Sequence, residues 1–323
     1  MNTIDRITTK NMTIGIQLPL DQIQGEEEQK RRREEGVPFP YGVPDWTNHA
    51  KYAKMVDQLG FAAIWMRDVP LYDPYRYGDA GPVFDPIVYL GYLSAITQQV
   101  VLGTGAIVLT LRHPIHVAKA AATIDQLSKG RLLLGIATGD RPVEFPIFGV
   151  DRRDRGVDIV ENVSFIQKAW QDGPLFENGV ELLPKPYQDT IPIVMAGRGS
   201  QTIDWIAQNL NGWFDYPRGI GETKRQIEKW KKALTEAKIA EKKPYLSNFH
   251  LQLHENPEHP LESLRFGGII GRNALIRYLH KLEEIGLDHL VFHLSNSERT
   301  IPEVLEELAE FVLPEFPTHE ISK

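Results

Sequence analysis

The sequence predicts an α/β fold, an eight-stranded parallel βα (TIM) barrel with insertions in the loops that follow the strands. Three observations support this prediction. Strand-like segments alternate with segments of helical periodicity eight times along the chain. Each helix can serve as the crossover that returns the chain to a parallel strand. The 323 residues contain no linker-like composition, so residues 1–323 are expected to form one domain.

The expected elements follow one another in a regular order. The segments expected as strands are 13–18, 61–66, 100–108, 131–137, 191–196, 212–216, 246–253 and 289–294. The helices expected after them are 45–59, 85–97, 114–128, 157–170, 201–209, 222–237, 272–285 and 302–312. The last helix carries the pattern of a capping box, formed by Thr300 and Glu303, which supports its predicted start.

Four long connections follow strands, at 19–44, 67–84, 139–155 and 254–271. Active sites of βα barrels form at the carboxyl ends of the strands, so these connections are expected to surround the functional site. The charged run at 26–35 is interpreted as an exposed segment or as a lid over that site. The insertion at 173–190 precedes a strand, so we expect a structural hairpin at the opposite end of the barrel.

The composition is that of an acidic protein without cysteine. The formal net charge is −7, which disfavours binding to nucleic acid. The lack of cysteine excludes disulfides, thiolate nucleophiles, zinc–thiolate sites and iron–sulfur clusters. No apolar stretch resembles a signal peptide or reaches the ~20 residues needed to span a bilayer. We therefore expect a cytoplasmic protein that does not act at a membrane.

Glycines interrupt the third predicted strand. Gly103 and Gly105 leave room for a flat ring to approach the backbone, or for a neighbouring side chain to pack. The segment does not match a dinucleotide-binding fingerprint, because the third glycine is missing and a strand continues through it.

Two later turns are candidates for binding an anion. Thr138 and Gly139 end the fourth strand at the barrel mouth. The fifth strand is followed by a turn before a helix, with backbone N–H groups, hydroxyls and one charge that suit a phosphate; its candidate residues are Gly197, Arg198, Gly199, Ser200 and Thr202. The alternative is an ordinary glycine turn in which Ser200 caps the helix.

Several of these motifs occur together in one known family. Gly103-Thr-Gly-Ala-Ile-Val-Leu109, Asp125-Gln-Leu-Ser-Lys-Gly-Arg131 and the Gly135-Ile136 strand resemble the bacterial luciferase-like flavin-dependent monooxygenases. The resemblance covers residues 12–216 well and the remainder by architecture alone. It implies a barrel that uses reduced FMN or, in some branches, a deazaflavin.

The resemblance also implies positions for the cofactor. Gly105 and Ala106 match positions beside the isoalloxazine ring, and Thr138 matches a position that reaches the phosphate, where luciferase has an arginine. Ser200 and Thr202 fall in the phosphate loop of the family. We expect Arg198 to supply the positive charge that Thr138 lacks.

The sequence departs from luciferase at two places. Luciferase has a Glu-His-His segment after strand two, where this chain has Arg67-Asp68-Val69, and a cysteine after strand four, where this chain has Ala137. Light emission and the luciferase acid–base residues are therefore not expected.

Polar residues are predicted inside the barrel, because alternate residues of a strand share one face. His289 and His293 of the last strand, Asn248 and His250 of the seventh, and Gln17 of the first are expected to point inward. They either contact a polar ligand or satisfy one another.

Two histidines are the candidate catalytic residues. His113 follows the third strand and is ranked first as a proton donor or substrate contact; the alternative is a loop histidine before a helix. His293 lies near the carboxyl end of the last strand. No metal site is expected, because His113 and His116 have no accompanying carboxylate ligand.

The resulting hypothesis is a two-component monooxygenase that uses reduced FMN and oxygen on a small organic substrate, with a separate flavin reductase supplying reduced FMN. One alternative is a deazaflavin-dependent dehydrogenase on the same barrel. Another is a non-catalytic flavin-binding protein. The oligomeric state is open, and a homodimer is one alternative.

Overall fold

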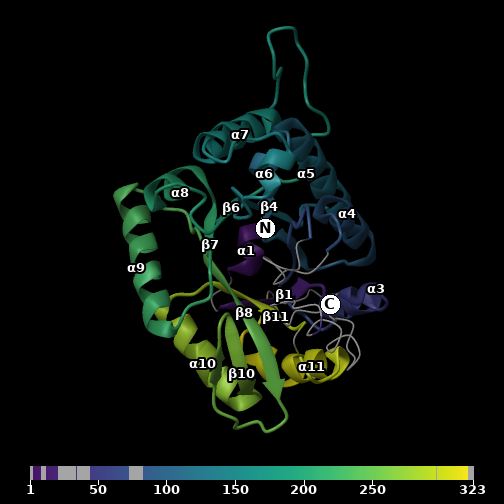
Figure 1. Cartoon of the computed structure of the whole chain (residues 1–323), viewed down its shortest axis with the longest axis vertical. Helices are drawn as coiled ribbons and strands as arrows, with labels where there is room; N and C mark the ends of the chain where they lie inside the picture. The colour runs from purple at the N-terminus through teal and green to yellow at the C-terminus, as the bar shows by residue number, and fades with distance from the viewer. Residues whose placement is uncertain are drawn as a thin grey trace.

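The computed structural model describes residues 3–8, 12–20, 34, 44–72, 83–295 and 297–318. Its central feature is a closed barrel of eight parallel strands, which confirms the predicted fold (Figure 1). In barrel order these strands are β1 (Thr13–Leu18), β2 (Ala63–Met66), β3 (Val101–Thr104), β5 (Leu132–Ala137), β6 (Ile193–Ala196), β7 (Gly212–Asp215), β8 (Tyr245–His254) and β11 (His289–His293). β11 pairs with both β8 and β1, which closes the barrel.

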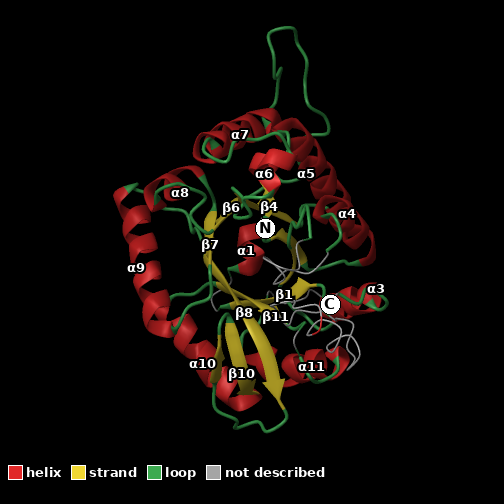
Figure 2. Ribbon diagram, viewed as in Figure 1, coloured by secondary structure: helices red, strands yellow, loops and turns green. Residues whose placement is uncertain are grey.

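Helices surround the barrel on its outer side (Figure 2). They are α3 (His49–Gln58), α4 (Pro86–Ile96), α5 (Pro114–Ser128), α7 (Arg155–Trp170), α8 (Ile203–Asn209), α9 (Ile220–Glu236), α10 (Arg272–Ile285) and α11 (Ile301–Glu307). The chain continues from α11 as a π-helical turn, η2 (Leu308–Val312), and a 3-10 turn, η3 (Leu313–Glu315). The predicted capping box of Thr300 and Glu303 is present at the start of α11. No helix in the described part of the chain is long and apolar enough to cross a membrane.

The interior of the barrel at the amino ends of the strands is filled with apolar side chains. A short helix, α1 (Thr3–Ile7), closes this end by contributing Ile4 and Ile7 to a cluster with Trp65, Val101 and other inward-facing residues. A Cβ atom on Gly103 would lie 2.6 Å from the Trp65 ring, so this glycine makes room for the tryptophan. The packing interpretation is therefore the correct one for Gly103.

His289 lies in the same closed end and is fully buried. Trp65 Nε1 donates to His289 Nε2 at 3.0 Å, so Nδ1 carries the proton of the neutral ring and donates to Thr13 Oγ1 at 2.7 Å. Thr13 Oγ1 donates in turn to the carbonyl of Ile7 at 2.7 Å. Burial lowers the pKa of His289 to about 3, so the imidazole is neutral at pH 7.

The luciferase-like Asp125–Arg131 segment stabilises the closed end from outside. The Asp125 carboxylate accepts hydrogen bonds from the backbone N–H groups of Tyr187 and Gln188, both at 2.9 Å. The buried Arg131 guanidinium donates to the carbonyls of Ser94, Thr97 and Val100 at 3.0 Å. These contacts tie the connections between neighbouring strands together, so this motif has a structural role.

Three segments differ from the sequence prediction. The expected strand 100–108 is divided into β3 and β4 (Ile107–Val108), with a cis peptide bond between Gly105 and Ala106. The connection after β8 is not only a loop, because β9 (Glu262–Leu264) and β10 (Gly267–Gly271) form within it and β10 pairs in parallel with β8. The insertion 173–190 contains a turn but no strand, and it projects from the barrel at the top of Figure 1.

Candidate cofactor and substrate site

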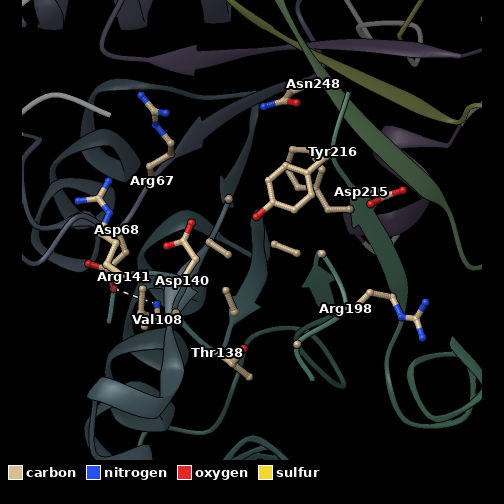
Figure 3. A pocket seen from close by; sticks show the side chains of 18 of the residues that line it. Arg67, Asp68, Val108, Thr138, Asp140, Arg141, Arg198, Asp215, Tyr216 and Asn248 are labelled. Carbon is tan, nitrogen blue, oxygen red and sulfur yellow. Dashed lines mark hydrogen bonds between the residues drawn. The ribbon is translucent and has the colours of Figure 1, made fainter. Parts of the chain in front are cut away.

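A cavity of about 440 Å³ opens at the carboxyl ends of the barrel strands, where the sequence predicted a site. Figure 3 shows side chains from several strand ends converging on it. Its lining divides into a floor of small residues, an arginine-rich side at the ends of β5 and β6, and a polar side at the ends of β1, β2 and β8.

The floor consists of small and flat side chains: Gly105, Ala106, Ala137, Ala196 and Phe214. A Cβ atom on Gly105 would lie 3.0 Å from the Phe214 ring, so a larger residue would narrow the floor. A low and largely apolar surface of this kind suits a planar ring system.

Arg155 organises the arginine-rich side. Its Nε donates to Ser200 Oγ at 3.0 Å, and its Nη1 donates to the carbonyl of Gly139 at 3.3 Å. These two bonds join the loops that follow β5 and β6. Arg152 and Arg198 also belong to the lining of this side, but Arg198 Nε donates to the carbonyl of Gln201 at 3.2 Å, and Figure 3 shows the Arg198 guanidinium turned away from the middle of the cavity. Such an arrangement favours a phosphate or another multiply charged anion.

The turn after β6 has a backbone shape that depends on glycine. Gly197 and Gly199 have φ angles of +65° and +53°, a region that L-residues with a Cβ rarely adopt. A Cβ atom on Gly199 would also collide with the Met195 side chain. The carbonyl of Gly197 accepts a hydrogen bond from Trp213 Nε1 at 2.6 Å, which fixes the turn to the neighbouring strand. Ser200 follows with a φ of +58° and points its hydroxyl to Arg155.

The polar side begins with a lateral row of residues on three adjacent strands. Gln17 of β1 pairs in register with His293 of β11, which pairs in register with His250 of β8. Gln17 is 3% exposed, and its Nε2 has no hydrogen-bond partner among the described residues. The same holds for the buried Oδ1 of Asn248, two residues before His250. A ligand of this cavity is therefore expected to supply one acceptor and one donor.

His250 and His293 stack on each other, with ring centroids 4.3 Å apart and an interplanar angle of 23°. Arg67 Nη2 lies 3.3 Å from His293 Nε2, and a guanidinium can only donate. Nε2 of His293 is therefore the acceptor, so Nδ1 carries the proton of the neutral ring; Ser295 Oγ lies 3.1 Å from Nδ1 and 3.3 Å from Nε2. The buried His293 ring therefore accepts a hydrogen bond that helps to position the Arg67 guanidinium.

Both imidazoles of this pair are neutral at pH 7. Burial, together with the nearby Arg67 charge, lowers the pKa of His250 to about 3. Burial, the neighbouring His250 and Arg67 hold the pKa of His293 well below its ordinary value of 6.5. The pair can accept hydrogen bonds, but its lowered pKa values disfavour uptake of a proton to form an imidazolium.

The fold and this geometry agree with a known family. A family model described as luciferase-like monooxygenase matches residues 12–305. The chain belongs to the luciferase-like monooxygenase family. This family comprises flavin-dependent oxidoreductases and includes both FMN monooxygenases and F420-dependent enzymes.

Individual relatives match parts of the chain. An uncharacterized protein of Mycobacterium tuberculosis is 34% identical over 145 residues, which cover 42% of this chain and 51% of that protein. The alkanal monooxygenase alpha chain of Photorhabdus luminescens is 26% identical over 167 residues, covering 49% of this chain and 44% of its own length. An F420-dependent glucose-6-phosphate dehydrogenase of Nakamurella multipartita is 28% identical over 160 residues, covering 46% of each chain. The chain thus spans about half the length of these curated relatives.

Solved structures of the same fold cover nearly the whole chain. The monooxygenase RslO1 of Streptomyces bottropensis superimposes with a TM-score of 0.73 at 18% identity, covering 94% of this chain and all of its own. An F420-dependent secondary alcohol dehydrogenase superimposes with a TM-score of 0.70 at 17% identity, covering 98% of this chain and 99% of its own. At these identities the likeness establishes the barrel and not the reaction.

Most of the predicted cofactor residues line the cavity. They are Gly105, Ala106, Thr138, Gly139, Gly197, Arg198, Gly199 and Ser200. Thr202 does not line it; its hydroxyl caps α8 by accepting a hydrogen bond from the Trp205 N–H at 3.1 Å. The charge expected from Arg198 is joined by Arg152 and Arg155, which were not ranked as cofactor residues. The sequence reasoning assigned Arg155 to a solvated or structural loop; its position after a barrel strand is the signal that could have indicated a role in the site.

The two predicted catalytic histidines lie in different places. His113 is exposed and caps the start of α5, where its Nδ1 accepts a hydrogen bond from the Ile115 N–H at 3.3 Å. It is not part of the cavity lining, so the structure gives it the role named as the alternative, a loop histidine before a helix. His293 is buried behind His250, and His250 is the imidazole that lines the cavity.

The segment that replaces the luciferase Glu-His-His has divided roles. The Asp68 carboxylate accepts hydrogen bonds from the Val108 N–H at 3.1 Å and from Arg112 Nε and Nη2 at 2.9 Å, and Arg112 also binds Asp85. Asp68 is therefore a structural residue that holds the chain after β4. Arg67 is the residue of this segment that contacts the buried histidine pair. Most of the charged run 26–35 lies outside the described residues, so its interpretation stays a prediction.

Proposed function

We propose that this chain is a monooxygenase that uses reduced FMN and oxygen on a small organic substrate. The observation that carries the proposal is the arrangement of Arg155, Ser200 and Gly139 beside the floor of small residues. This side offers charge and hydroxyl groups for a phosphate, and the adjacent floor offers space for a planar ring. An FMN molecule has both parts in one ligand.

The residues present fit this cofactor on three counts. Arg152 and Arg155 would hold the phosphate, with Ser200 as a further donor. Arg198, whose Nε donates to the Gln201 carbonyl, would have to turn toward the cavity to join them. The floor at Gly105 and neighbouring alanines would accept the ring system. The buried Oδ1 of Asn248 lacks a donor among the described residues, and the pyrimidine edge of a flavin offers an N–H.

Reduced FMN, when bound, would supply the electrons that activate oxygen. The chain itself would position the ring, exclude water from the barrel interior and orient the substrate. His250 lines the cavity as a neutral imidazole, so it can accept a hydrogen bond from the substrate. No nucleophilic side chain is required for this role.

A separate flavin reductase would deliver the reduced cofactor, and the reaction would take place in the cytoplasm. The reductase follows from the family pattern, and the location follows from the lack of cysteine and of a signal-like segment in the sequence. A homodimer is compatible with both.

The second candidate is a deazaflavin-dependent dehydrogenase, which the F420-dependent relatives favour. It would transfer a hydride and consume no oxygen. The experiment that separates the candidates is a binding titration of the purified chain with reduced FMN, oxidised FMN, riboflavin and F420, followed by oxygen consumption with the cofactor that binds. Tight binding of F420 with weak binding of FMN would select the second candidate.

The phosphate assignment is tested with Arg155→Met. Removal of a charge-assisted contact is expected to weaken FMN binding about tenfold to a hundredfold, because such contacts contribute about 1.5–3 kcal/mol. Riboflavin has no phosphate, so its affinity should stay the same. Arg153→Met is the matched control, because Arg153 binds the neighbouring Asp151 carboxylate and does not line the cavity. Equal loss of FMN and riboflavin affinity in Arg155→Met would contradict the assignment.

A further inference from the structure

A groove of about 800 Å³ lies on the outer side of the barrel. It is bounded by the start of α9, one face of α10 and the β9–β10 hairpin; β10 and α10 are in the lower part of Figure 1. In the described part of the chain it shares only Pro217 and Phe266 with the lining of the cavity. The groove and the cavity are therefore neighbours with separate linings.

The alternation of side chains along β8 assigns its residues to these two places. Asn248 and His250 line the cavity, whereas Phe249 between them lines the groove. The Phe249 ring is buried, and its centroid lies 5.6 Å from that of Tyr278 on α10. The backbone of a barrel strand thus separates the groove from the proposed flavin site.

The base of the groove is apolar and long. Phe249 and Ile270 are buried in it, and Leu264 at its edge is 44% exposed. α10 lines the groove from Ala274 to Glu284, a length of about 15 Å at the helical rise of about 1.5 Å per residue. A base of this length and chemistry suits an extended apolar chain.

Donors without partners stand on the same face of α10. Among the described residues, the Tyr278 hydroxyl has no hydrogen-bond partner and the Lys281 ammonium has no ion pair. The two residues are three positions apart on the helix, so their side chains are neighbours. Arg265 of the hairpin, also without an ion pair among the described residues, adds a second cation, and its guanidinium lies 4.8 Å over the Phe266 ring centroid. An oxyanion can accept from neighbouring donors of this kind, because it offers several lone pairs.

The remaining charges of the groove leave it positive. Arg277 is paired with Glu258 at 2.8 Å, and Arg218 binds the Asp215 carboxylate at 3.2 Å. The described lining holds one further carboxylate, Glu284, against the two unpaired cations, so a positive charge remains. This local excess contrasts with the formal net charge of −7 and favours an anion over a neutral or cationic ligand.

We propose that this groove binds a second ligand, an organic anion with an extended apolar chain, whose head group accepts hydrogen bonds from Tyr278 and Lys281. The apolar chain lies along Phe249 and Leu264. Because the groove is separate from the cavity, this ligand is neither the flavin nor its substrate, and the inference does not rest on the proposed function.

The test is isothermal titration calorimetry of the full chain with octanoate. Octan-1-ol has the same chain without the charge, and acetate has the head group without the chain. Each titration is run without FMN and with saturating FMN, so that the cavity is filled in one arm. We expect octanoate to bind at one site per chain, about tenfold or more tightly than either comparison compound. FMN should not displace it, since the two linings are separate.

Variants locate the site. Lys281→Gln should lower the octanoate affinity about tenfold and leave the weaker binding of octan-1-ol unchanged. Tyr278→Phe keeps the ring and removes the hydroxyl, with an expected loss of about threefold. Leu264→Ser should weaken octanoate and octan-1-ol alike. The matched controls are Lys229→Gln on α9 and Leu127→Ser on α5, because both residues are exposed outside the groove lining.

The outcomes separate this inference from the proposed function. Octanoate that binds no more tightly than octan-1-ol or acetate, that FMN displaces, or that binds Lys281→Gln and Leu264→Ser as tightly as the wild type would overturn the inference. Loss of octanoate binding in Arg155→Met would place octanoate in the cavity and have the same consequence. If FMN does not bind the wild-type chain while octanoate binding depends on Lys281, the flavin assignment is wrong and the groove site stands.

Discussion

Two histidines of the same strand illustrate the difference between the two ends of the barrel interior. His289 and His293 are both buried on β11, four residues apart. At the closed end, Trp65 and Thr13 satisfy both ring nitrogens of His289. At the open end, His293 contacts Arg67 and stacks on His250, which lines the cavity.

His289 and His293 are both buried, but the hydrogen bonding around the two rings differs. His289 donates to the Thr13 hydroxyl, which donates to the Ile7 carbonyl, so each of these polar groups has a hydrogen-bond partner. Around His293 two buried polar atoms, Gln17 Nε2 and Asn248 Oδ1, have no partner in the described part of the chain. Burial of a polar residue therefore does not distinguish a structural group from a binding group. Its unmet hydrogen bonds do.

The largest expected effect is acid destabilisation, to which both ends contribute. The folded-state pKa values of His250, His289 and His293 lie below the ordinary value of 6.5. As the pH falls below about 6.5, the unfolded chain takes up protons that the folded chain does not, so stability is full above this pH and is lost below it. Each histidine contributes at most about 1.4 kcal/mol per pH unit, or about 4 kcal/mol for the three at pH 5.5.

Urea denaturation at pH 7.5, 6.5 and 5.5 measures this loss, and the window stays above the range in which ordinary carboxylates titrate. His116→Gln is the control, because His116 is exposed on α5 and its replacement should leave the pH dependence unchanged. An unfolding midpoint that stays constant from pH 7.5 to 5.5 would show that the buried imidazoles are not kept neutral by the fold.

Leucine substitutions separate the two histidines of β11. His289→Leu should lower the free energy of unfolding by about 3 kcal/mol, because the Trp65 N–H is left buried without an acceptor and the ring contacts are lost. It should not change the affinity for FMN. His293→Leu should instead weaken FMN binding, because His250 of the cavity lining loses the ring on which it stacks. Chemical denaturation and calorimetry on both variants measure this. The same ligand effect in both variants would remove the distinction between the two ends.

Substitutions of two glycines at positive φ test whether the turn after β6 depends on its close contact with Met195. Gly149 has a φ of +69° and open space where a Cβ atom would lie, whereas Gly199 has a φ of +53° and faces Met195. Gly149→Ala should cost about 1 kcal/mol through backbone strain alone. Gly199→Ala should cost about 2 kcal/mol and also weaken FMN binding, because the turn that carries Ser200 must shift. If the two variants lose equal stability and bind FMN equally, the turn does not depend on this contact.

Periodicity and turn residues were sufficient to predict much of the fold. The bounds of β1, α5 and α10 agree with the prediction, because alternating apolar residues and Pro114 or Gly286 mark where these elements begin or end. β9 and β10 were missed, because the exposed Glu262–Leu264 segment and the glycines at 267–268 carry no strand pattern. Their strand character comes from pairing with β8, which local sequence does not reveal.

The candidate site was predicted in part. Glycine motifs and strand ends located its floor and its phosphate turn, because parallel strands end at the same face of a barrel. Sequence alone did not show that Asp68 binds Arg112 while the neighbouring Arg67 contacts the histidine pair. It also did not show the direction of the His113 side chain, because position after a strand fixes where the backbone lies and not where a side chain points.

The smallest expected effect is that of His113→Asn. Asparagine is a preferred N-cap residue, so it can replace the hydrogen bond that His113 accepts from the Ile115 N–H at the start of α5. Stability should change by less than about 0.5 kcal/mol, and FMN affinity and oxygen consumption should stay at the wild-type level. His250→Asn is the matched substitution on the cavity wall, and it should weaken ligand binding because His250 lines the cavity. Loss of oxygen consumption in His113→Asn with normal stability would show that the exposed loop before α5 closes onto the cavity during turnover, and His113 would then belong with the open end of the barrel.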